Sequence, residues 1–244
     1  DPGPKLNVGF VADAFALENP KGENAVLKFL ENDVEGLHSD RVMLGAAGLA
    51  RQGRLEDAVN FVRRFLGPAG ERPISLLLAN MAIIEGHERL WLEHLNSYLE
   101  PYNISRIRLH NGPTILHRLR ADAGRQILEG PLVTVIMPSY QAAMYIEPAA
   151  TSILEQSWRN LELIIVDDGS TDDTWQVVQR LAGRDSRVRV FRNHRNLGPY
   201  VSKNLALQQA RGDYITGHDA DDWAHPQRIE YHMAKITESR GAMK

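Results

Sequence analysis

The chain has 244 residues, 43% of them hydrophobic, which is enough material for one large core or two small ones. Its formal net charge of -3 excludes a broad basic surface, so no nucleic-acid partner is expected. The absence of cysteine excludes disulfide bonds and thiolate metal sites. No run reaches the roughly 20 apolar residues of a membrane span, so the expected location is cytoplasmic, with any membrane association arising through partners.

The N-terminal part, residues 1–100, shows helical periodicity. Its apolar residues recur at helical spacing from Glu23 to Leu99, beginning with Ala25, Leu27, Phe29 and Leu30. Glycine and proline divide the pattern into helices of roughly 12 to 16 residues. A shift of 33 positions places Leu44 on Leu77, Ala46 on Ala79, Ala50 on Ile83, Gly53 on Gly86, Val62 on Leu95 and Leu66 on Leu99.

This offset is close to the length of a tetratricopeptide repeat, so we predict a tetratricopeptide-like region, with a plain helical bundle as the alternative. In both cases the expected use is docking, because no catalytic groups converge there. A protein partner for these helices is left open.

Residues 101–130 are expected to form a connector. They combine a short β-like stretch at 104–109 with a basic run, expected to be helical, that contains Arg118, Arg120 and Arg125. A solvated helix face explains these arginines more simply than contact with phosphate or RNA.

Residues 131–244 change to short apolar runs that alternate with amphipathic segments. The predicted strands are 132–137, 163–166, 188–191 and 214–216, and the predicted helices are 144–156, 172–181 and 200–210. Continuously apolar strands alternating with helices indicate an α/β domain whose mostly parallel sheet is covered on both faces. Ligands of such sheets bind beyond the carboxyl ends of the strands, where the polar motifs fall.

One polar motif, DDGSTDD at 167–173, follows the second predicted strand. Thr171 or Asp172 is expected to cap the next helix, but four carboxylates exceed that need. The order of residues differs from the Asp-x-Asp-Gly-Thr of haloacid dehalogenases, which argues against phosphatase chemistry. No Gly-x-Gly-x-x-Gly follows the first strand, which argues against a nicotinamide or flavin cofactor.

A second acidic loop follows the last predicted strand, with Asp219, Asp221 and Asp222 within four residues. These carboxylates repel one another unless a cation lies among them, and hard oxygen ligands suit Mg²⁺ or Mn²⁺. Such an ion would bridge to a diphosphate. His218 and His225 flank the loop, and for both a surface or hydrogen-bonding role is favoured over metal ligation.

The motifs also occur in a specific order. They are VTVIMPSYQ (133–141), SILEQSW (152–158), LELIIVDDGSTDDT (161–174), NLGPYVSKNLAL (196–207) and ARGDYITGHDADDWAHPQR (210–228). In this order they resemble the family 2 glycosyltransferases of the GT-A fold, over residues 131 to about 235. The sequence departs from the family at Gln141, where Asn is usual, and at 198–200, where smaller residues are usual.

The resemblance implies a donor pocket. Pro138, Tyr140 and Asp167 or Asp168 would surround the nucleoside base, and Lys203 and Asn204 would border the pocket. Asp219 would reach the ribose or the metal, and Asp221 would hold the metal on the diphosphate.

The resemblance also implies the reaction, which is metal-dependent (Mn²⁺ or Mg²⁺) transfer of a sugar, with inversion, from a nucleoside-diphosphate sugar to a glycan or other hydroxyl acceptor. UDP-sugars are favoured, and bacterial polysaccharide or glycoconjugate synthesis is the expected setting. The family's general base lies well downstream of the acidic loop, so it is expected beyond Lys244, in a missing acceptor half, and no catalytic residue is assigned. The alternatives are a nucleotidyltransferase, a non-catalytic nucleotide-sugar-binding module, and a docking protein that acts through its helices.

Overall fold

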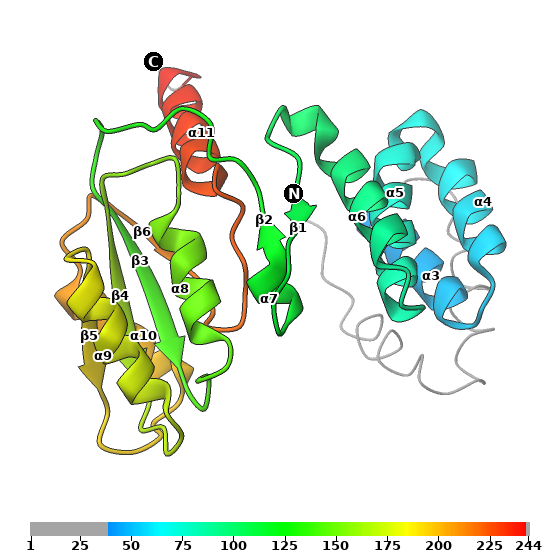
Figure 1. The fold of residues 1–244 in the computed structure, drawn as a ribbon. Helices are drawn as coiled ribbons and strands as arrows, with labels where there is room; N and C mark the ends of the chain where they lie inside the picture. Colours follow the sequence, from blue (N-terminus) through cyan, green and yellow to red (C-terminus); the bar gives the residue numbers. More distant parts are fainter. Residues whose placement is uncertain (1–38, 243–244) are drawn as a thin grey trace, which may run out of the picture. The chain divides into compact units, whose positions relative to one another are not determined.

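The structure, a computed structural model, describes residues 39–242 (Figure 1). The chain divides between Asn103 and Ile104 into two compact units, which we call the helical unit and the α/β unit. The first expected helical positions, from Ala25 to Leu30, lie outside the described residues. Within 39–242, no helix has the length and the apolar run that a membrane span requires.

Two helical hairpins form the described part of the helical unit. Its helices are α3 (Ser39–Arg51), α4 (Leu55–Leu66), α5 (Glu71–Ile84) and α6 (Glu88–Leu99), with short 3-10 turns at Gly67–Gly70 and Glu100–Tyr102. Gly53 reverses the chain between α3 and α4, and Gly86 does so between α5 and α6. Both glycines have a φ of +78°, a left-handed conformation that L side chains rarely adopt. Val42, Val62 and Leu77 belong to the apolar core of this unit.

The two hairpins follow the 33-residue offset of the sequence, since α4 begins at Leu55 and α6 at Glu88. The tetratricopeptide-like assignment itself stays a prediction.

The α/β unit is built on a four-stranded sheet in the order β5-β4-β3-β6, in which all neighbouring strands are parallel. This confirms the predicted parallel sheet. The elements are β1 (Arg108–Leu109), α7 (Ile115–Arg118), β2 (Leu119–Arg120), β3 (Val133–Ser139), α8 (Ile146–Leu154), β4 (Leu161–Asp167), α9 (Thr174–Arg184), β5 (Val188–Arg192), α10 (Pro199–Gln209), β6 (Tyr214–Gly217) and α11 (Arg228–Ala242).

Helices cover the two faces of this sheet unequally, with α8 and α9 on one face and α10 on the other (Figure 1). Met137 and Ile165 belong to the core beneath α8 and α9, to which α11 adds Ile229. Ile136 and Ile164 face α10 instead. Because β3 and β4 are buried on both faces, their sequences are almost continuously apolar. The strands share one direction, so the carboxyl ends of β3, β4 and β6 meet at one edge.

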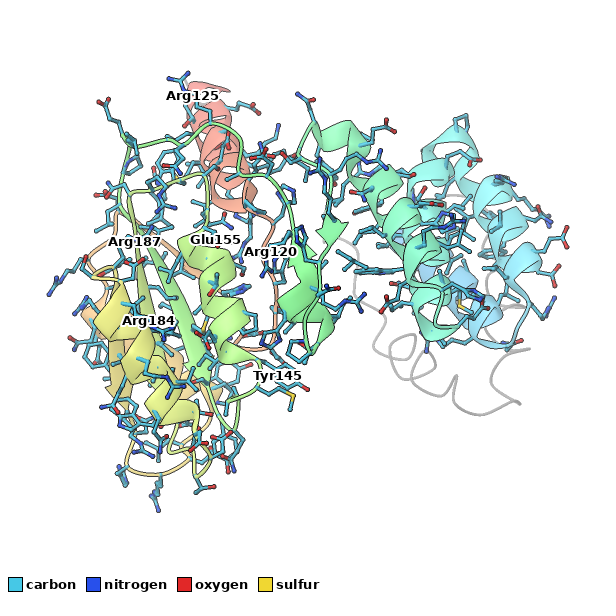
Figure 2. All side chains as sticks on the ribbon, viewed as in Figure 1. Arg120, Arg125, Tyr145, Glu155, Arg184 and Arg187 are labelled. Carbon is cyan, nitrogen blue, oxygen red and sulfur yellow. The ribbon has the colours of Figure 1, made fainter. Side chains whose placement is uncertain are left out.

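The segment at 104–130 differs from the expected connector helix. Only the four residues of α7 are helical there. Arg120 lies in β2, which pairs with β1, and Arg125 lies in an irregular stretch (Figure 2). The expected helical run ends at Arg118, because Leu119 and Arg120 pair with β1, and the expectation was wrong for Arg120 and Arg125.

Candidate functional site

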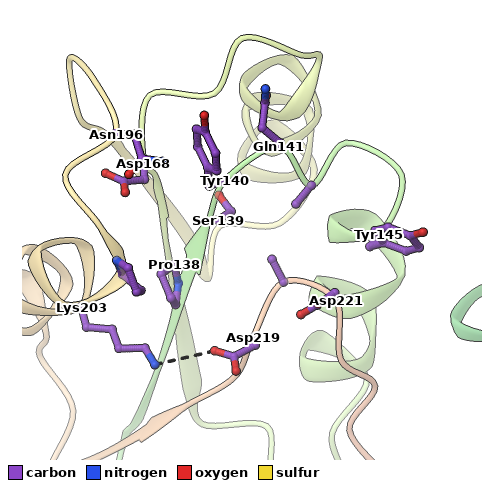
Figure 3. Close-up of a pocket in the computed structure, with 13 residues that line it drawn as sticks. Pro138, Ser139, Tyr140, Gln141, Tyr145, Asp168, Asn196, Lys203, Asp219 and Asp221 are labelled. Atoms are coloured by element: carbon purple, nitrogen blue, oxygen red, sulfur yellow. Dashed lines mark ion pairs between the residues drawn. The ribbon is translucent and has the colours of Figure 1, made fainter. Parts of the chain in front are cut away.

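A cleft of about 520 Å³ opens at the carboxyl ends of β3, β4 and β6 (Figure 3). It combines aromatic, acidic and basic side chains from loops far apart in the sequence. The lining residues are Pro138, Ser139, Tyr140, Gln141, Ala142, Tyr145, Asp168, Asn196, Pro199, Lys203, Asp219, Ala220 and Asp221. The position agrees with the rule that open parallel sheets bind ligands at this edge.

Most of the residues expected at the donor pocket line this cleft, but Asp167 and Asn204 do not. The Asp167 carboxylate is fully buried. Its Oδ2 lies 2.9 Å from Nε of Arg192, and its Oδ1 accepts the Ser170 N–H at 3.2 Å. Asn204 is exposed on α10, one position after Lys203.

Asp168 holds the loop that forms one wall of the cleft. Its Oδ1 accepts the Asn193 side-chain amide at 2.6 Å and the Leu197 N–H at 3.0 Å, and its Oδ2 accepts the Gly198 N–H at 2.7 Å. Burial by itself would raise the pKa of Asp168, but these donors outweigh burial, and the pKa lies below its ordinary value. The carboxylate therefore remains ionised, and its oxygens are already engaged by the loop.

Gly169 allows this loop to lie directly against the end of β4. Its φ is +71°, and a Cβ atom there would come within 2.5 Å of the Arg195 carbonyl carbon and 2.8 Å of the Asn196 nitrogen. The close approach of two backbones leaves no room for a side chain. This explains the glycine in the DDGSTDD motif.

The acidic loop follows β6, and the Asp222 N–H donates to the Asp219 carbonyl at 3.2 Å to close a turn. Lys203 Nζ lies 3.7 Å from Asp219 Oδ1, linking α10 to the loop (Figure 3). The pKa of Asp222 lies above its ordinary value, first because of burial and then because of the charges of Asp219 and Asp221. Lys203 therefore offsets part of the negative charge of this loop, and mutual repulsion among its three carboxylates remains.

Residues 134–243 match the family described as Glycosyl transferase family 2. This part of the chain belongs to glycosyl transferase family 2. Over 100 residues it is 41% identical to an uncharacterized glycosyltransferase of Haemophilus influenzae. The aligned region covers 41% of this chain and 40% of that protein. It is also 35% identical over 107 residues to glycosyltransferase GlyG of Streptococcus pneumoniae, covering 44% of this chain and 36% of the relative. The chain thus spans about two fifths of the length of these curated relatives.

Solved structures are also similar to parts of this chain. S. aureus TarS 1-349 in complex with UDP-GlcNAc is 31% identical, with a TM-score of 0.41, over 43% of this chain and 31% of that chain. The mannosyltransferase PcManGT from Pyrobaculum calidifontis, in complex with GDP-Man and Mn²⁺, is 24% identical, with a TM-score of 0.40, over 66% of this chain and 43% of that chain.

Gln141, where the family usually has Asn, joins the loops after β3 and β4. Its Oε1 accepts the N–H groups of Thr171 and Asp172, both at 3.1 Å, and its Nε2 donates to the Thr171 hydroxyl at 3.0 Å. Its φ of +52° is left-handed, a conformation that Asn tolerates better than Gln. The longer side chain therefore keeps its cross-loop hydrogen bonds in a backbone conformation better suited to Asn.

The carboxylates of the family 2 domain suit a metal that is shared with a ligand. Within the described residues, no three acidic or histidine side chains are grouped to hold an ion by themselves. Asp219 and Asp221 both line the cleft, however. Mg²⁺ is usually bound through one or two carboxylates together with substrate phosphates and water, so these two side chains fit that arrangement.

The histidines beside the acidic loop make hydrogen bonds within the protein. His218 is buried, and burial together with the Arg228 charge lowers its pKa to about 4, while its Nδ1 lies 3.0 Å from an Arg228 nitrogen. His225 Nδ1 accepts the Gln227 N–H at 3.1 Å, which leaves Nε2 to donate to the Ser105 carbonyl at 2.8 Å. This geometry agrees with the expected hydrogen-bonding role.

Two asparagines beside the cleft were not anticipated from the sequence. Asn193 is buried directly after β5 and bonds to both Asp168 and the Ser202 hydroxyl, and Asn196 lines the cleft. The signal was available, because Asn193 is a polar residue at the carboxyl end of a strand, the position that singled out the other site residues.

Proposed function

We propose that the family 2 domain binds a nucleoside-diphosphate sugar in the cleft and transfers the sugar to a hydroxyl acceptor. The observation that carries this proposal is the convergence of Tyr140, Asp168 and the Lys203–Asp219 pair at one sheet edge, in a segment that matches this family. The cleft thus offers an aromatic surface for a base and a polar end for a charged diphosphate.

The base and ribose would lie against Pro138, Tyr140 and Asp168. Tyr140 is 49% exposed, and its ring would stack against a flat base. Asp168 Oδ2 can accept one further hydrogen bond, because each carboxylate oxygen has two acceptor positions and Oδ2 uses one of them, whereas Oδ1 uses both. UDP is the first nucleotide to test, since the family resemblance favours it.

The diphosphate would lie near Lys203, Asp219 and Asp221. A bound Mn²⁺ or Mg²⁺ held by the two aspartates would neutralise the negative charge of the departing diphosphate. Lys203 contributes a fixed positive charge on the same side, which favours an anionic ligand.

In the proposed transfer the acceptor oxygen bonds to the anomeric carbon as the bond from that carbon to the diphosphate oxygen breaks, which inverts the centre. The hydroxyl proton must pass to a general base. The family resemblance places this base downstream of the acidic loop, and no residue within 39–242 is assigned to that role. The acceptor is proposed to be a glycan, as in bacterial polysaccharide or glycoconjugate synthesis.

Titration calorimetry tests the binding step. UDP should bind more tightly with Mn²⁺ than with EDTA, and GDP should serve as the comparison nucleotide. Absence of heat for any nucleoside diphosphate, with or without metal, would contradict the proposal. Release of UDP from a UDP-sugar only when a glycan acceptor is present would separate an enzyme from a module that binds its donor without turnover.

A further inference from the structure

The segment from Ala224 to Ile229 carries the acidic loop back into the core, and the end of α8 holds one side of it. The Ser152 hydroxyl accepts the Ala224 N–H at 3.0 Å. Gln156 is fully buried, and its Nε2 donates to the His225 carbonyl at 2.8 Å while its Oε1 accepts the Ile229 N–H at 3.0 Å. Two side chains of the SILEQSW motif therefore bind backbone groups at both ends of this segment.

Ser105 holds the other side of the same segment. Its carbonyl accepts from His225 Nε2 at 2.8 Å, and its N–H donates to Gln227 Oε1 at 2.8 Å. Both backbone groups of one residue are thus bound by side chains more than a hundred positions later in the chain. Ser105 also lies before residue 134, where the family match begins.

We propose that Ser105, Gln156 and His225 form a clamp that positions the acidic loop for metal and nucleotide binding, an inference that rests on the proposed function. The bonded segment begins at Ala224, two residues after Asp222. Asp219, Asp221 and Asp222 are all exposed and repel one another, so hydrogen bonds at the loop's return are needed to keep them together. These three clamp residues act on the loop as positioning residues, and none of them lines the cleft.

The clamp explains why Gln156 and His225, which do not line the cleft, make so many hydrogen bonds. A buried glutamine costs stability unless its amide is fully bonded, and Gln156 uses both ends of its amide on the same return segment. The neutral His225 ring is likewise used at both nitrogens. The clamp therefore joins residues 104–130, most of the expected connector, to the acidic loop within the α/β unit.

The test compares His225→Ala with His225→Gln in the full chain, and His232→Ala, an exposed histidine one turn into α11, is the matched control. Amide hydrogen exchange without metal or nucleotide is the first measurement. Exchange across 219–224 should rise in His225→Ala while exchange in β4 stays unchanged. His225→Gln should restore most of the protection, because its amide can donate to the Ser105 carbonyl.

The second measurement is the ratio of UDP affinities with and without Mn²⁺. It should fall about tenfold in His225→Ala, the size of effect seen when partners that orient metal ligands are lost. His232→Ala should stay within about twofold, as is typical of surface substitutions. Gln227→Ala, which removes a single bond to Ser105, should change the ratio in the same direction by less.

Unchanged exchange across 219–224 in His225→Ala, or an equal rise in β4, would overturn the clamp. Lack of rescue by His225→Gln would count against it in the same way. If the wild-type chain shows no effect of Mn²⁺ on UDP affinity, the proposed metal role fails, and the exchange measurement still decides whether the clamp positions the loop.

Discussion

The core of the helical unit is built from apolar side chains, while the α/β unit, which contains the family 2 domain, also buries a large set of polar ones. Among the described residues, Asn96 is the polar side chain buried in the helical unit, and it bonds to the Leu92 carbonyl within its own helix. In the α/β unit, Glu162, Asp167, Asp168 and Gln156 are buried and bonded across elements. Hydrogen bonds of a buried polar group fix both the distance and the orientation of the elements that they join. The unit that holds the cleft is therefore positioned more strictly than the helical unit, whose core relies on apolar packing.

The largest effect is expected where two backbones meet in the α/β unit. Gly169→Ala must move the loop at Arg195 and Asn196 and also adopt a positive φ, so we expect a loss of about 3 kcal/mol or more. Urea denaturation measures it. Gly183→Ala is the matched control, because nothing lies near its added Cβ on α9, and it should be neutral or slightly stabilising. Equal losses from both variants would show that the close approach at Gly169 does not matter.

The acidic loop should respond next most strongly. Asp221→Ala removes a charged oxygen from the cleft and should weaken UDP binding with Mn²⁺ by roughly 10- to 100-fold. Asp173→Ala is the control, since Asp173 precedes α9 without a side-chain capping bond and should have little effect. Calorimetry of both variants decides, and similar losses would remove the metal role of Asp221.

The stability contributed by the buried Glu162 carboxylate should depend on pH, which provides a further test of the contrast between the two units. It accepts from Thr134 Oγ1, the Arg211 N–H and Arg189, which together outweigh burial and hold its pKa below the ordinary 4.5. The stability it contributes is present above pH 4.5 and is lost as the pH falls through the lower folded pKa. Glu162→Gln should therefore cost about 2 kcal/mol at pH 7, and the difference from wild type should shrink in acid.

The matched change in the helical unit is Glu71→Gln. Glu71 pairs with Arg63 at 2.8 Å, but both side chains are more than half exposed, so no measurable loss is expected. Denaturation of both variants at pH 7 and pH 4 provides the test. A loss from Glu71→Gln as large as that from Glu162→Gln would contradict the contrast between the two units.

The smallest effect on the site is expected from the core of the helical unit. Leu77→Ala should destabilise that unit by about 2 to 4 kcal/mol, because it leaves a cavity among apolar neighbours. The UDP affinity of the family 2 domain should stay within about twofold of wild type. Thermal unfolding and calorimetry on the same sample would show both results, and a large fall in affinity would mean that the helices support the site directly.

The sequence predicted all four strands of the main sheet, and most clearly β3 and β4, whose apolar runs are nearly continuous and end in polar motifs. It could not choose between Asp167 and Asp168, since that choice depends on where β4 ends and on the ion pair with Arg192. Lys203 and Asn204 are adjacent on a helix and point about 100° apart, so both could not face the cleft. Helix phase relative to the sheet is set by packing, which the sequence does not show.

The structure and contacts of the segment around Ser105 were harder still to predict from the sequence. Its strands β1 and β2 have two residues each, too short for any periodicity, and its partners His225 and Gln227 are about 120 positions away. Local patterns predict local structure, and contacts of this range depend on the completed fold. The motif SILEQSW was recognised from the sequence, but the partners of Gln156 became visible only in the structure.

The hydrogen bonds of the Asp168 carboxylate affect how much conformational entropy is lost when a ligand binds. Its three donors, from Asn193, Leu197 and Gly198, all belong to the protein, so the fold itself holds this loop without a contact from a nucleotide. A nucleotide that enters does not have to immobilise that wall, and the conformational entropy otherwise lost on binding is already lost on folding. The family 2 domain thus presents a preorganised surface on the Asp168 side of the cleft. On the other side the clamp holds the return of the acidic loop, and a cation would relieve the repulsion among its carboxylates.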